Sequence, residues 1–122
     1  MATEGYRVAD AMSREISEPD WKLFRQLHAV ALERFCERVL GEVHRIAADS
    51  SKGTHERYLA VFDLIRRRDR ELADAFNDLR RSTALVQLAR IQFHDLFSGE
   101  EFARFSPETR ASVELFLEMW RA

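Results

Sequence analysis

The chain has 122 residues and a formal net charge of −2; 46% of its residues are hydrophobic and 33% are charged. This composition excludes a disordered chain, and the length suffices for one domain with a proper core. The balanced charge gives no overall attraction to nucleic acid or anionic lipid, and no apolar run approaches the length of a spanning helix, so we expect no membrane partner.

Residues 1–16 are polar, with only scattered apolar side chains. We expect this N-terminal segment either to be poorly ordered or to form a short docking helix. Residues 17–122 are predicted to form a single helical-bundle domain. Because residues 1–12 contain no apolar signal-peptide core, we expect a cytoplasmic protein.

A long amphipathic helix is predicted from Ser17 to Ala48. Ser17 is a typical N-cap, Pro19 suits the first turn, and Gly53 follows the helix as a stop signal. Apolar residues recur at gaps of three or four, which places them on one helical stripe. The members of this stripe are Phe24, Leu27, Ala31, Phe35, Val39, Val43 and Ile46.

A second helix is predicted after Thr54, and its apolar stripe is interrupted by six charged residues, 66–71. Within this run, Asp69 lies at the position where an apolar residue would continue the stripe. If the helix is continuous, Asp69 requires an arginine partner or has a raised pKa; if the helix breaks there, Asp69 caps a new turn. The sequence leaves open whether the helix continues through 66–71 and through Asn77.

A third helix is predicted from Leu79 to Phe97, with Gln87 on its polar side. A short helical turn follows, opened by the capping-box pattern of Ser98 and Glu101, and the last helix starts at Ser106. The predicted fold class is therefore all-α: an up-and-down bundle of four main helices plus a short helical turn, with a long first helix.

The last predicted helix is about half as long as the first, so part of the first helix's apolar surface stays uncovered. Either the N-terminal segment or a second copy of the chain has to cover this surface. Because two-fold dimers are the commonest oligomers, we expect a homodimer formed through the first or second helix.

No residue pattern in the sequence indicates a catalytic, cofactor-binding or metal site. The four histidines lack the helical spacings that hold a metal ion, and there is no glycine-rich phosphate loop or nucleophile elbow. Cys36, the single cysteine, lies among apolar residues in the middle of the first helix, which favours packing over reactivity.

An arginine cluster is the most prominent charged feature. If the second helix continues, five cations share similar faces, and such a cluster can grip phosphates. Interleaved acidic residues at pairing distances favour a solvated or subunit-contacting surface instead. With Asp69, the candidate interaction residues are Arg66, Arg67, Arg70, Arg80 and Arg81.

These observations predict a non-catalytic protein–protein interaction or assembly module that acts as a homo-oligomer or with an unidentified protein partner. One alternative is a nucleic-acid-binding or regulatory protein that uses the cluster from Arg66 to Arg81, although the interleaved acids argue against it. A second alternative is an enzyme without a recognisable motif.

Overall fold

A computed structural model describes residues 15–122, and every regular element within that range is a helix. The predicted all-α fold with a long first helix is confirmed. The elements are α2 (Glu18–Ala47), α3 (Thr54–Phe76), the 3₁₀ turn η1 (Arg81–Thr83), α4 (Ala84–Phe93), the short α5 (Gly99–Ala103) and α6 (Pro107–Arg121). The expectation for the N-terminal segment falls almost entirely on residues outside the described range.

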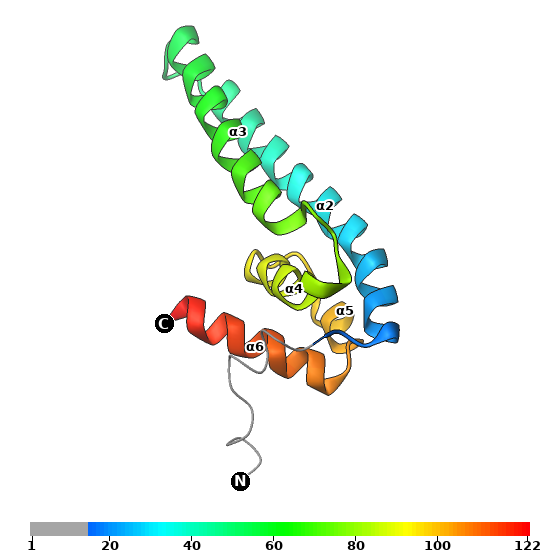
Figure 1. Cartoon of the computed structure of the whole chain (residues 1–122). Coiled ribbons are helices and arrows are strands. Elements are labelled where there is room, and N and C mark those ends of the chain that lie inside the picture. Colours follow the sequence, from blue (N-terminus) through cyan, green and yellow to red (C-terminus); the bar gives the residue numbers. More distant parts are fainter. Residues whose placement is uncertain (1–14) are drawn as a thin grey trace.

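The helices α2 and α3 form an antiparallel hairpin, one end of which projects beyond the rest of the molecule (Figure 1). We call the projecting end, around residues 47–57, the tip. The helices α4, α5 and α6 gather at the opposite end, which we call the base. There α4 contacts α3, α2 and α6, so it connects the hairpin to the C-terminal helix.

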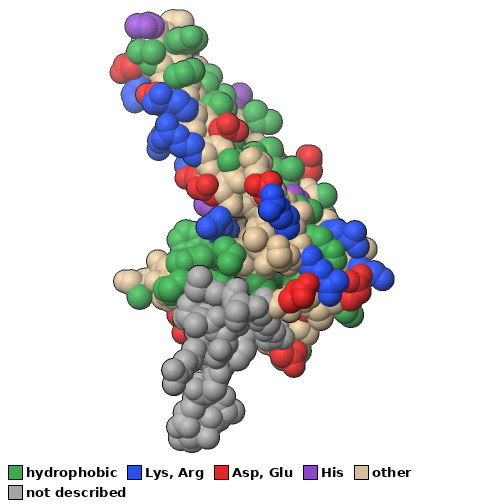
Figure 2. All heavy atoms as spheres, in the orientation of Figure 1, with side chains coloured by type: hydrophobic (Ala, Val, Ile, Leu, Met, Phe, Trp, Pro, Cys, Tyr) green, Lys and Arg blue, Asp and Glu red, His purple; other side chains and the backbone are tan. Residues whose placement is uncertain are grey.

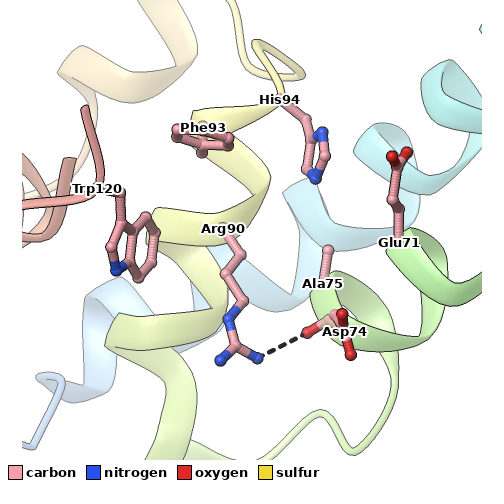
Figure 3. A pocket seen from close by; sticks show the side chains of 7 residues that line it. All are labelled: Glu71, Asp74, Ala75, Arg90, Phe93, His94 and Trp120. Atoms are coloured by element: carbon pink, nitrogen blue, oxygen red, sulfur yellow. Dashed lines mark hydrogen bonds between the residues drawn. The ribbon is translucent and has the colours of Figure 1, made fainter. Parts of the chain in front are cut away.

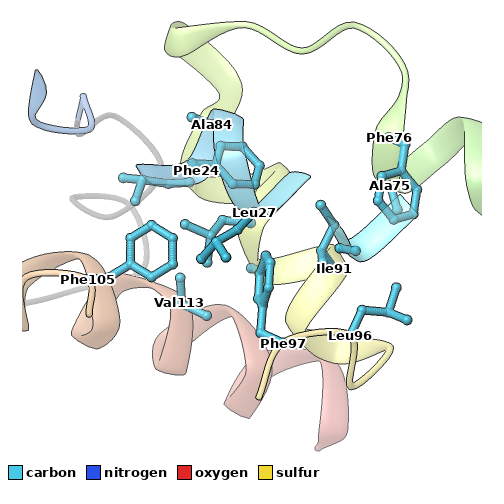
Figure 4. Packing of buried hydrophobic residues seen from close by; sticks show 14 of the residues in the cluster. Phe24, Leu27, Ala75, Phe76, Ala84, Ile91, Leu96, Phe97, Phe105 and Val113 are labelled. Atoms are coloured by element: carbon cyan, nitrogen blue, oxygen red, sulfur yellow. The ribbon is translucent and has the colours of Figure 1, made fainter. Parts of the chain in front are cut away.

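The apolar core lies in the base. Phe24, Leu88, Ile91 and Val113 are fully buried, and Figure 4 shows side chains from α2, α4 and α6 converging there. Thus the first half of the predicted α2 stripe is covered by the C-terminal helices. The second half lies along α3, in the part of the hairpin that projects from the base.

The second predicted helix corresponds to α3 and ends before Asn77. α3 is continuous through residues 66–71 and stops at Phe76, after which Asp78 adopts a left-handed backbone (φ 57°). The predicted third helix, from Leu79 to Phe97, is wrong at both ends, because residues 77–80 form a connection and α4 spans only Ala84–Phe93.

The side chain of Gln87 holds this connection in place with hydrogen bonds. Its side-chain amide donates to the main-chain oxygens of Asn77 (2.7 Å) and Asp78 (3.1 Å). Gln87 is therefore buried, not on the polar side of its helix as predicted. A buried amide is stable here because its hydrogen bonds are made within the protein.

The start of α2 is joined to the start of α6 by a buried carboxylate. Asp20 accepts hydrogen bonds from the Ser106 hydroxyl (2.6 Å), the Ser106 main-chain N–H (3.1 Å) and the Thr109 hydroxyl (2.6 Å). Burial raises the pKa of Asp20, but these hydrogen bonds together lower it by more. The resulting pKa is below its ordinary value.

Asp20→Ala is expected to destabilise the fold by about 2–4 kcal/mol, because it leaves buried polar groups of Ser106 and Thr109 without their acceptor. Urea denaturation followed by circular dichroism measures this change. Glu33→Ala, at an exposed position of the same helix, is the control and should change stability by less than about 0.5 kcal/mol. Equal effects of the two substitutions would contradict the role given to Asp20.

A second polar connection ties the middle of α2 to the α4–α5 region. Arg34 donates to both carboxylate oxygens of Glu101 (2.6 and 3.0 Å) and to the main-chain oxygen of Leu96 (2.9 Å). Glu101 also accepts the N–H of Ser98, completing the predicted capping box. The hydrogen bond from Arg34 lowers the pKa of Glu101 to about 2.

This lowered pKa predicts an acid-sensitive contribution to stability. The carboxylate is favoured in the folded state, so its contribution is complete above the unfolded pKa of about 4.3 and is lost as the pH falls toward 2. At neutral pH, Glu101→Gln should lower the free energy of unfolding by about 1 kcal/mol. The value is small because Arg34 is partly exposed and water screens the pair. In denaturation measured across this pH range, the difference between the two proteins should shrink toward pH 2; a constant difference would contradict the assignment.

Candidate functional site

One side of the α2–α3 hairpin carries large apolar side chains that no other part of the described structure covers. We call this side the hairpin face. Its exposed side chains are Leu40 on α2 and Tyr58, Phe62 and Ile65 on α3, which are 65%, 66%, 54% and 42% exposed. Figure 2 shows hydrophobic side chains reaching the surface along the projecting hairpin, between charged ones.

Two adjoining grooves run along the hairpin face and share Ile65. The groove nearer the tip has a volume of about 530 Å³ and includes Ala47, Tyr58 and Phe62 in its lining. The groove nearer the base has a volume of about 240 Å³. Its lining residues are Phe35, Cys36, Val39, Leu40, Ile65, Arg68, Asp69 and Leu72.

The base cannot cover the hairpin face because it is attached to the other side of α2. Arg34 and Arg38 bond main-chain oxygens of Leu96 and His94, in the α4–α5 region. Side chains two positions apart are rotated by about 200° around the helix axis, so they point in nearly opposite directions. Cys36 and Leu40 therefore lie opposite these two arginines, on the side away from α4.

The structure divides the predicted arginine cluster. Arg66, Arg67 and Arg70 are exposed along α3. Arg66 lies 3.8 Å from Asp63, and its guanidinium lies 5.7 Å from the centre of the Phe62 ring. Arg66 thus borders the hairpin face and partly shields Phe62.

The other two arginines of the cluster lie beyond the end of α3. Arg80 is 3.6 Å from Asp78. Arg81 pairs with Glu18 and donates to the main-chain oxygen of Ile16, so it holds the chain entering α2. Because the helix ends at Phe76, these two residues do not continue the row formed by Arg66 and Arg70.

Arg68 is the arginine of this run that sequence reasoning missed. It bonds Glu42 across the hairpin (3.0 Å) and Glu71 along α3 (2.9 Å), and the bond from Arg68 is the largest influence lowering the pKa of Glu42. Spacing of three residues signals the pairing with Glu71. No pattern in the sequence signals the pairing with Glu42, 26 residues away.

Asp69 lies on the hairpin face in a continuous part of α3, so it caps no helix break. It is exposed, so it is not a buried ion-pair partner either. Within residues 15–122 the structure shows no salt bridge or hydrogen bond to its carboxylate. Asp69 is therefore a free charge at the edge of an apolar groove.

A further pocket of about 290 Å³ lies where α3, α4 and α6 meet (Figure 3). Arg90 donates to the main-chain oxygen of Asp74 (3.0 Å), and Glu71 is bonded to Arg68. The His94 ring packs edge-on against Phe35 and Phe93. These groups serve packing and helix contacts, and they do not form a nucleophile with an adjacent base.

The described residues contain no group of three or more side chains suited to a metal ion. None of the helices in that part of the chain combines the length and the apolar character needed to cross a membrane. No family model, curated protein or solved structure matches the chain. The hairpin face, with its four large exposed apolar side chains, is therefore the candidate functional site.

The Arg68 pairing is testable by comparison with Arg66. Glu42→Gln should lower the free energy of unfolding by about 1 kcal/mol, because it weakens a half-buried, charge-assisted hydrogen bond between α2 and α3. Arg66→Gln should change it by less than about 0.5 kcal/mol, because the pair with Asp63 is exposed. Thermal and urea denaturation check both values, and the reverse order would contradict the geometry.

Proposed function

We propose that this chain is a non-catalytic assembly module that forms a homo-oligomer through the hairpin face. The observation that carries the proposal is the group formed by Leu40, Tyr58, Phe62 and Ile65: four large, exposed apolar side chains on one side of one hairpin. Contiguous exposed apolar surface of this kind is typical of protein–protein contact sites.

The position of the hairpin face supports contact with a large partner. It lies along the hairpin that projects from the base (Figure 1), and its α2 side chains Cys36 and Leu40 lie opposite the arginines that bind the base, so a partner can approach from that side. The two grooves are open to solvent, and each is lined mainly by apolar side chains from two helices. Such a surface accepts helices better than a small ligand, which needs a more enclosed site.

A second copy of the chain is the simplest partner. In a two-fold dimer the same face is used by both copies, so one apolar surface is enough to explain the assembly. The proposal includes a cytoplasmic setting, with which the single unpaired cysteine, Cys36, agrees because thiols stay reduced there.

The proposal is tested by the mass of the particle in solution. Sedimentation equilibrium over a wide range of protein concentration should show a monomer–dimer equilibrium for the natural sequence, and Phe62→Glu should shift it to monomer. Because Phe62 is already exposed, circular dichroism and thermal unfolding of the monomer should change little.

Met119→Glu is the matched control, since Met119 is 47% exposed on α6, away from the hairpin face. This variant should dimerise as the natural sequence does. A natural sequence that stays monomeric at every concentration would overturn the proposed function.

A further inference from the structure

We propose that the second copy binds the hairpin face antiparallel, with α3 packed against α3 around a two-fold axis that crosses this helix between residues 63 and 64. This inference rests on the proposed self-association and specifies its geometry. The two hairpins then form a four-helix bundle of overlapping tips, and the two bases lie at opposite ends.

The spacing along α3 supports this axis. A two-fold axis perpendicular to a helix exchanges residues that are equally far from it in the two copies. Phe62 and Ile65 are equally far from the point between residues 63 and 64, and so are Tyr58 and Asp69. Around this axis, Phe62 therefore packs against Ile65 of the second copy, and Tyr58 lies opposite Asp69 of the second copy.

The pairing of Tyr58 with Asp69 accounts for a carboxylate on an apolar face. Within the described residues neither the Tyr58 hydroxyl nor the Asp69 carboxylate has a hydrogen-bond partner, and both side chains are exposed. In the antiparallel dimer the hydroxyl donates to the carboxylate at each end of the α3–α3 contact. The acidic side chain then has a partner at the border of the interface instead of being desolvated alone.

The α2 side of the hairpin face has the same spacing as the α3 side. Cys36, Leu40, Val43 and Ala47 follow one another at intervals of four, three and four residues, as Tyr58, Phe62, Ile65 and Asp69 do. Cys36, Leu40 and Ala47 line the same grooves as the α3 stripe, so both stripes lie on the same side of the hairpin. When α3 packs on α3, α2 packs on α2, and both stripes are covered together.

A parallel dimer, with both bases at one end, fits these observations less well. It packs α2 of one copy on α3 of the other, so Asp69 lies opposite the apolar region around Leu40. Tyr58 and Asp69 are then separated by eleven residues of helix, about 16 Å, in both copies. The carboxylate gains no partner in this arrangement.

The charge at position 58 discriminates between the two arrangements. Tyr58→Lys and Tyr58→Glu remove the same ring, but only lysine is attracted to Asp69 of the second copy. The lysine variant should dimerise about tenfold more tightly than the glutamate variant in sedimentation equilibrium, because each dimer contains two such contacts. The difference should vanish when Asp69→Asn is added and reverse when Asp69→Lys is added.

A cross-linking experiment gives an independent measure of the geometry. In a Cys36→Ser background, a Phe62→Cys chain and an Ile65→Cys chain carrying different tags are mixed and oxidised. The antiparallel dimer should give the mixed disulfide, because the two positions are opposite one another. The control mixture of Leu40→Cys with Ile65→Cys should give little, whereas a parallel dimer should give mainly this second product.

The outcomes separate the two proposals. If the natural sequence dimerises but Tyr58→Lys and Tyr58→Glu associate equally, or the Leu40–Ile65 cross-link dominates, the antiparallel arrangement is wrong and the proposed function stands. If the natural sequence does not associate at all, both proposals fail.

Discussion

The length of α2 constrains the whole molecule. Its 30 residues extend about 45 Å, whereas the 15 residues of α6 extend about 22 Å and the ten of α4 about 15 Å. The C-terminal helices can therefore cover only one end of α2. α3 runs alongside the remainder, but a single helix buries only a narrow strip of a neighbour, so the flanks of both helices stay open.

Polar contacts reinforce the apolar packing that holds the base against one end and one side of α2. Asp20 joins the first turn of α2 to the start of α6, and Arg34 and Arg38 bind main-chain oxygens near the end of α4. Hydrogen bonds are directional, so they add a specific orientation to the non-directional apolar packing. The hairpin face stays uncovered because it lies on the side of α2 opposite these attachments.

Local sequence signals predicted much of this structure. Ser17 and Pro19 mark the start of α2, Gly53 follows its end, and Ser98 with Glu101 forms the capping box of α5, because each signal acts over only a few residues. The expectation that part of the long helix stays uncovered also follows from lengths alone. These features depend on helix geometry, which the sequence specifies directly.

The remaining features depend on contacts between distant residues, which no local pattern encodes. Asp20 reads as a first-turn acid, yet its main partners are 86 and 89 positions away. Arg80 and Arg81 share a face with Arg66 only if one helix joins them, and the left-handed backbone at Asp78 interrupts that helix. Asp69 lacks a partner within residues 15–122 because α3 continues past it with that side exposed, and the continuity of α3 is not specified by the charged run itself.

The unbroken course of α2 has a mechanical consequence. One rod of hydrogen-bonded backbone passes from the Asp20 attachment to the tip, so the packing of the base against the first half of α2 sets the direction in which the tip points. A small change in how the base grips α2 would swing the tip through a larger arc, as with a lever. The direction in which the hairpin face points is therefore set by the base, which is attached to the opposite side of α2.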